Sequence, residues 1–211
     1  MPQLILTAAV LAASPGPLEA RLRTALATFS AKECAAFFHE CESWSAAIPF
    51  VPKPADVELL RDNRLEWTAA GASLVEMARI TLLLRAIELN GTAMPLVSDW
   101  YLAGDEEEKR AVARALWLVP QPKSLVDVGV LAATSQRVRV FEGICLDNPF
   151  PAAYFDMASF ELMVARALDI DPNWAPRIMG LNDRASLVPS SKADAPPFPS
   201  TRALRAQRTL R

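Results

Sequence analysis

Histidine and glycine are scarce in this chain of 211 residues, and their scarcity disfavours several kinds of site. The single histidine, His39, makes a catalytic triad or a histidine-rich metal site improbable, and we expect it to be a packed or surface residue. The seven glycines form neither a GxGxxG nor a Walker loop, and GxSxG and HExxH motifs are also missing. We therefore expect no cofactor and no metal, although a carboxylate site with little histidine stays open, since helices can present Glu to metals.

Cysteine is also sparse, with three residues and no CxxC pair. Cys34 and Cys41 are seven apart and could share a helix face, but two thiols do not make a zinc site. An odd number of cysteines at such spacings is typical of reduced thiols buried in a cytoplasmic protein, and we expect Cys145 to be buried in the same way.

Strong net charge and long apolar runs are missing as well. The net charge of -2 argues against a nucleic-acid-binding module, which would carry a basic face. No apolar run reaches the roughly 20 residues of a membrane span. Leu4–Ala13 resembles the apolar part of a signal peptide, but no Lys or Arg precedes it, so we expect a first core helix there.

Seventeen prolines divide the chain into amphipathic segments with helical spacing. Helix starts are predicted at these capping or proline positions: Pro17, Ser30, Ser73, Pro95, Asp105, Ser124 and Asp156. The stretch from Ser124 to Cys145 predicts two helices or one bent helix, and the alternation over Arg137–Phe141 is too short to establish a strand. These patterns predict an all-α fold of antiparallel helical hairpins, as a short HEAT-like α-solenoid or an irregular helical bundle.

One internal similarity favours the solenoid. Phe50–Pro54 (FVPKP) and Leu118–Pro122 (LVPQP) are nearly the same string, 68 residues apart, which equals two 34-residue helical hairpins. Duplication and chance both explain this similarity, and the sequence does not decide between them.

We expect residues 1–187 to form one all-helical domain and residues 188–211 to form a flexible tail rich in Pro and Ser. The end of the tail is basic, because residues 191–211 hold five cationic side chains and one anionic side chain. It is either a solvated extension or a small basic helix that docks on an acidic partner, and only this tail hints at nucleic acid or membrane.

The most distinctive stretch is the junction from Val140 to Phe155, where an apolar helix stops at Asp147-Asn148-Pro149 and a new one starts at Pro151. In a structural interpretation, Glu142 pairs with an arginine, Gly143 permits close helix approach, and Asp147 and Asn148 act as stop and cap. In a functional interpretation, partly buried polar groups beside a helix break bind a ligand. The candidate binding residues are Glu142, Asp147, Asn148, Phe150, Tyr154 and Arg184.

The junction resembles the signature of EboA-domain proteins, which read F-E-A-I followed by a D-N-P-Y-P string and an aromatic residue; here these are Phe141–Ile144 and Asp147–Phe155. Met163–Leu168, Ile178–Arg184 and Leu116–Pro122 are similar to three flanking motifs of the family, so the resemblance covers about residues 73 to 187. The chain departs from the family at Thr134-Ser135-Gln136 and at Glu161-Leu162, where relatives carry R-S/T-N and N-Q. A ligand bound by those groups in relatives would therefore be different here.

The resemblance implies an all-helical, solenoid-like cytoplasmic protein encoded in bacterial operons for a secreted small molecule. It assigns no reaction. We therefore expect a non-enzymatic accessory or adaptor protein in natural-product biosynthesis or export, whose partner is a co-encoded enzyme. The alternative is a small-molecule-binding protein or enzyme, with a helical pocket around Glu142 and Asp147 that Arg184 closes.

Overall fold

The computed structural model describes residues 2–28, 30–41 and 48–184. Within these ranges the protein has thirteen α-helices and no β-strand, which confirms the predicted all-α class. The helices are α1 Pro2–Ala13, α2 Gly16–Leu26, α3 Ala31–Glu40, α4 Pro54–Asp62, α5 Glu66–Ala69, α6 Leu74–Asn90, α7 Met94–Ala103, α8 Glu106–Ala115, α9 Val126–Ala133, α10 Val138–Cys145, α11 Phe150–Tyr154, α12 Met157–Ile170 and α13 Leu181–Arg184.

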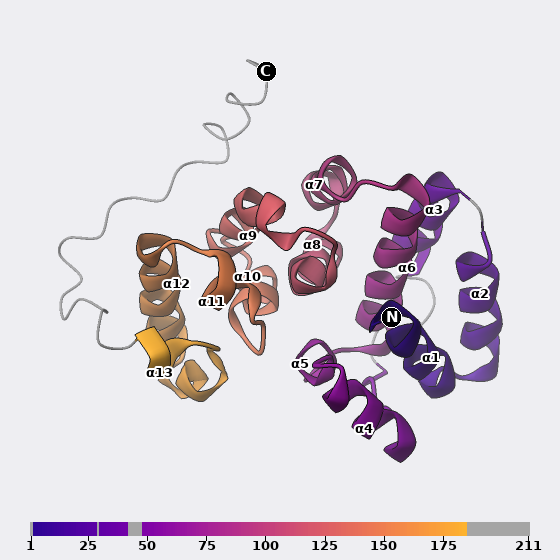
Figure 1. The fold of residues 1–211 in the computed structure, drawn as a ribbon, viewed down its shortest axis with the longest axis horizontal. Helices are drawn as coiled ribbons and strands as arrows, with labels where there is room; N and C mark the ends of the chain where they lie inside the picture. Colours follow the sequence, from indigo (N-terminus) through magenta and orange to yellow (C-terminus); the bar gives the residue numbers. More distant parts are fainter. Residues whose placement is uncertain (1, 29, 42–47, 185–211) are drawn as a thin grey trace.

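The helices succeed one another along the long axis of the molecule, with α1 to α3 at one end and α12 at the other (Figure 1). Three short 3-10 turns, at Leu116–Leu118, Pro122–Leu125 and Pro172–Arg177, connect the later helices. The buried apolar side chains form one cluster that runs from Leu6 to Ile178. The described helices therefore share a single core.

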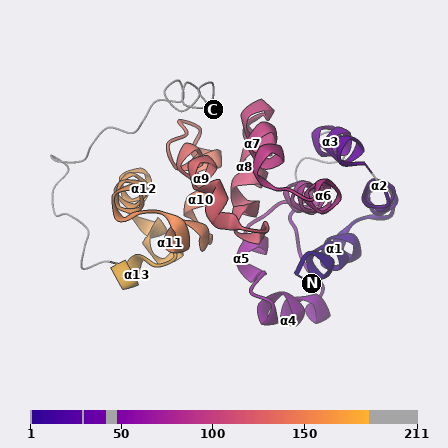
Figure 2. The same cartoon turned by 45° about the horizontal axis from the view of Figure 1, so that its top comes forward.

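Helix α6 is the centre of the N-terminal part and packs against α1, α2 and α3 on one side and α8 on the other (Figure 2). Every side chain from Leu74 to Leu84 is buried, as expected for a helix that is apolar on most faces. Gly91 ends it in the left-handed conformation at φ 73°, which glycine adopts without a steric cost. Farther along the chain, α10 packs between α8 and α9.

Ser73 caps α6 as predicted, and two further predicted caps form as expected. Asp105 and Glu108 make a complete capping box at the start of α8, each side chain accepting a hydrogen bond from the other residue's backbone N–H. Asp156 accepts a hydrogen bond from the backbone of Ser159 and starts α12. Local polar chemistry therefore specifies these two helix starts.

Another predicted start, at Ser30, was confirmed without its side-chain hydrogen bond, and the start predicted at Ser124 was wrong by two residues. Ser30 is the N-terminal cap position of α3, as predicted, but its side chain makes no capping hydrogen bond, and the Glu33 side chain accepts a hydrogen bond from the Thr28 hydroxyl. Ser124 lies inside a 3-10 turn and donates to the carbonyl of Gln121, so α9 begins two residues later. The stretch that follows consists of two helices, α9 and α10, and Arg137–Phe141 enters α10 and no strand.

The two similar strings have different structures. Phe50 is buried and bonded to the backbone of Ala72, and its string leads directly into α4. The second string passes through Gln121 at φ 55° into a 3-10 turn. This difference gives no support to a duplication.

The three cysteines are free and buried, as predicted. Helix α1 contributes Leu6, Ala9 and Val10 to the core, which agrees with the expected first core helix. None of the helices in the described ranges has both the length and the apolarity needed to cross a bilayer. The basic tail lies outside the described residues.

Candidate functional site

The junction after α10 turns at Asp147, which adopts the left-handed conformation at φ 52°. Aspartate tolerates this conformation better than most residues because its short side chain can bond locally. Its backbone N–H donates to the carbonyl of Arg177 at 2.8 Å, and its Oδ2 accepts from Arg177 Nε at 2.8 Å. The pair fastens the 3-10 turn Pro172–Arg177 to the end of α10.

Asn148 is 3% exposed and uses its amide entirely within the protein. Its Nδ2 donates to the carbonyls of Ala113 at 3.2 Å and Gly143 at 2.9 Å, and its Oδ1 accepts from the backbone of Phe150 at 3.0 Å. Because these groups belong to α8, α10 and α11, one side chain joins three helices. Asn148 thus caps the turn into α11, as in the structural interpretation, and is also a buried polar group, as in the functional interpretation.

Aromatic packing accounts for Phe150 and much of Tyr154. Phe150 is fully buried, and its ring lies 5.1 Å from that of Tyr154 and 6.1 Å from that of Phe155, measured between centroids. Tyr154 is half-buried and also neighbours Trp117 at 6.1 Å. Phe150 thus lies in the core, whereas Tyr154 keeps an exposed part.

Glu142 lies half-buried on α10 and forms no ion pair with a described side chain. It does act on Arg139, whose pKa is raised chiefly by the hydrogen bond to Glu107 and to a smaller extent by the charge of Glu142. Arg184 ends α13, and its side chain lies outside the described part of the structure. The structure therefore brings Asp147, Asn148, Phe150 and Tyr154 together, with Glu142 one helical turn before them on α10.

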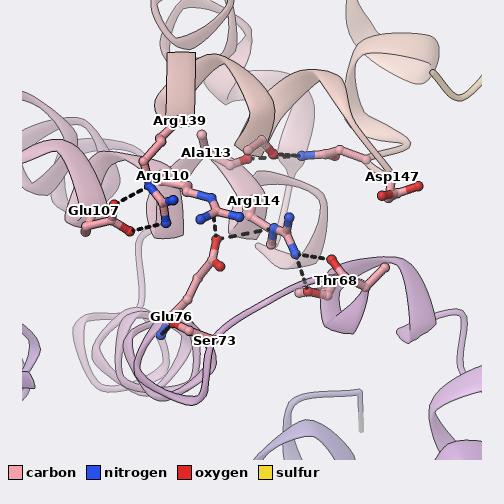
Figure 3. A network of polar contacts seen from close by, with 12 residues as sticks. Thr68, Ser73, Glu76, Glu107, Arg110, Ala113, Arg114, Arg139 and Asp147 are labelled. Atoms are coloured by element: carbon pink, nitrogen blue, oxygen red, sulfur yellow. Dashed lines mark hydrogen bonds and ion pairs between the residues drawn. The ribbon is translucent and has the colours of Figure 1, made fainter. Parts of the chain in front are cut away.

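The densest group of buried charges lies beside this junction, between α6 and α8 (Figure 3). Glu76 is 3% exposed, and its Oε1 lies 3.3 Å from both Arg110 Nε and Arg114 Nε. Ser73 Oγ accepts from the Glu76 backbone as predicted, but the Glu76 side chain turns to the two arginines and not back to the cap. Two guanidinium groups thus share one carboxylate.

Arg114 is also held by the chain that precedes α6. Its Nη1 donates to the carbonyls of Thr68 at 3.1 Å and Ala70 at 2.7 Å. Burial lowers the pKa of Arg114, while the charge of Glu76 opposes this shift and that of Asp147 adds a smaller opposing contribution. Arg177, the partner of Asp147, lowers the pKa of Arg114 again, so the two members of this junction pair act on Arg114 in opposite directions.

Sequence reasoning missed Arg110 and Arg114. The signal was present, because two arginines four residues apart alternate with small apolar residues in the helix that starts at Asp105. Such spacing places both arginines on one helix face. Their alanine neighbours are small, so another helix can approach this face closely and bury the arginines. The apolar pattern over Val112, Ala115 and Leu116 concealed this.

The remaining candidates lie elsewhere. His39 is exposed and its Nδ1 lies 2.7 Å from Glu108 Oε1, so it joins α3 to the cap of α8. A shallow hollow of about 310 Å³ opens between α3 and α7 beside Lys32, Asp99 and Trp100, away from the junction. Across the described ranges, no three His, Cys, Asp or Glu side chains gather as metal ligands would.

Comparison with known proteins identifies a family for this chain. Residues 47–191 match the family model described as "Metabolite traffic protein EboA". Neither the curated proteins nor the solved structures gave a match. The matched range contains the junction and the buried charges of α6 and α8.

Proposed function

Because this chain belongs to the EboA family, we propose that it serves metabolite traffic as a non-enzymatic accessory protein. In this role it acts as a cytoplasmic adaptor with partner enzymes of bacterial natural-product biosynthesis or export. The family description supports the traffic role, and the internal use of the junction residues supports the adaptor role.

The observation that carries the proposal is the position of Asn148. Its three hydrogen bonds join α8, α10 and α11, so the most distinctive polar residue of the junction positions helices. Asp147 similarly fastens the turn at Arg177. The junction residues therefore hold helices in fixed positions. A protein that binds partners by docking needs a surface of fixed shape, and such contacts would maintain one.

Co-purification tests the adaptor role. The tagged full-length chain, expressed with the enzymes encoded beside it, is expected to recover one of them as a stable complex at defined stoichiometry. Removal of residues 189–211, or added salt, should weaken that complex if the basic tail contributes to docking. A protein that runs alone in size-exclusion chromatography with every co-encoded enzyme would contradict the proposal.

A second candidate function is small-molecule binding or catalysis at the junction, and the half-buried Glu142, which has no ion-pair partner among the described side chains, favours it. Thermal unfolding in the presence of pathway sugars and phosphates tests this alternative. Glu142→Gln and Asp147→Asn should then reduce the ligand-induced stabilisation. If both variants keep ligand binding and pathway output, the junction is not a pocket.

A further inference from the structure

We infer that Arg110, supported by Arg114 and Glu76, is a binding site for an oxyanion, either the carboxylate or the phosphate group of a small metabolite. This inference goes beyond the adaptor role and does not depend on it. It rests on the charges, the unused donors and the accessibility of the group between α6 and α8 (Figure 3).

The buried charges are unbalanced. Glu76, Arg110 and Arg114 together carry one negative and two positive charges, and all three residues are at most 8% exposed. Of the neighbouring charges, the pairs Arg139–Glu107 and Arg177–Asp147 are each neutral, and the half-buried Glu142 forms no ion pair with Arg110 or Arg114. A buried charge without a counterion is costly, and a bound anion would remove that cost.

Arg110 has the donors that such an anion needs. Nη1 of Arg114 donates to two backbone carbonyls. By contrast, the Nη atoms of Arg110 form no hydrogen bond with any described residue. The Arg110 side chain is 10% exposed, and only its Nε is both buried and unbonded, so its outer nitrogens reach the surface. Glu76 approaches from the Nε side, which leaves the outer nitrogens available.

The chemistry of this site selects oxyanions. A planar guanidinium with free terminal N–H groups matches the two oxygens of a carboxylate or phosphate, and burial strengthens each charge-assisted bond. Gly143 contributes by its lack of a side chain, because a Cβ there would lie 2.9 Å from the Arg110 carbonyl. The close approach of α10 therefore holds the backbone of Arg110 in place.

The test uses the full-length protein, inorganic phosphate and acetate as separate probes, and chloride at equal ionic strength as the reference. At saturation, at least one oxyanion is expected to raise the midpoint of thermal unfolding by about 2 °C or more over chloride. In a ¹⁵N–¹H spectrum of the same protein, the Arg110 Nε–H resonance should shift with the same saturation curve. A shift with phosphate alone, acetate alone or both supports the site and identifies its preferred class.

Variants assign the effect to Arg110. Arg110→Met should abolish the stabilisation, and Arg110→Lys should weaken binding roughly tenfold because the charge stays while the fork is lost. Arg139→Met is the matched control, since Arg139 lies close by but is exposed and occupied by Glu107, and it should keep the stabilisation.

The inference is overturned if neither anion shifts the midpoint beyond chloride, if Arg110→Met keeps the full stabilisation, or if Arg139→Met loses it equally. If Arg110→Met does not fold, the resonance titration of the unmodified protein decides, because an unmoved Arg110 signal excludes the site. Loss of a partner complex leaves this result unaffected, and absence of anion binding leaves the adaptor role intact.

Discussion

Single side chains in this protein secure helix ends by reaching carbonyl groups on other elements. Arg166 is a further example, because its Nη1 donates to Ala133 at 3.0 Å while its guanidinium lies 4.4 Å from the centroid of the Phe141 ring. Asn148 and Arg114 act in the same way. The last carbonyls of a helix lack partners within the helix, so these long polar side chains satisfy groups that would otherwise be costly to bury.

The buried thiols give a prediction for individual side chains. Burial raises the pKa of Cys41 from 9.0 to about 12, and burial does the same for Cys145. The native thiols therefore stay protonated at pH 8, and we expect a disulfide reagent to label none of the three cysteines in the folded protein and all three in denaturant. Rapid labelling of the folded protein would contradict the burial.

The same shifts set a pH dependence. The unfolded thiols ionise near pH 9 and the folded ones only near pH 12, so between these values the unfolded state binds fewer protons. The free energy of unfolding should thus be independent of these thiols below about pH 8 and fall as the pH rises above about 9. Urea unfolding at several pH values measures this effect.

The helices differ in whether neighbouring residues specify where they start. The start of α8 and the start of α12 were predictable because Asp105 and Asp156 are local caps. The start of α9 was not, because Gln121 takes a left-handed conformation and Ser124 bonds backwards inside the turn. A pattern of residue types does not distinguish a helix start from a 3-10 turn that leads into it.

The contact between α8 and α10 gives a prediction for a helix pair. In Gly143→Ala the new Cβ would meet the Arg110 carbonyl at 2.9 Å and Arg110 Cγ at 3.1 Å. The helices must then separate, and we expect a loss of about 1–3 kcal/mol in the free energy of unfolding, measured with urea.

The matched control for that substitution is Gly16→Ala. Gly16 is also in a helix, but nothing beyond its chain neighbours and its own helix lies within 4 Å of the position that a Cβ would take there, so the change should stay within about 0.5 kcal/mol of neutral. Equal effects at the two positions would mean that helix propensity, and not close approach, governs Gly143.

Across the molecule as a whole, Glu76 connects α6 to α8, the two helices on either side of α7 in the chain. Its α6 packs on α1 and α3, while Arg110 and Arg114 belong to α8, which packs on α10. The apolar core is one cluster across these helices. The charges between α6 and α8 therefore lie where the N-terminal and C-terminal helices meet within the shared apolar cluster.

Glu76→Gln tests this connection. Removing the carboxylate leaves two buried arginines without a counterion, so we expect a loss of about 3–5 kcal/mol in the free energy of unfolding. Glu19→Gln is the control, because it breaks the exposed pair with Arg23 and should cost less than about 1 kcal/mol. Similar costs for both substitutions in chemical denaturation would show that Glu76 is not buried as described.

The all-α class and most helix bounds could be predicted from the amino-acid pattern, because capping residues, prolines and apolar spacing act within a few neighbours. The family was indicated separately, by the resemblance of the junction to the EboA signature. The pattern also pointed to Asp147 and Asn148 as special. Only the tertiary structure showed that Asn148 joins three helices. The same holds for the convergence of Arg110 and Arg114 on Glu76. These partners lie about 35 residues apart along the chain, and such contacts depend on how helices pack, which no local pattern records.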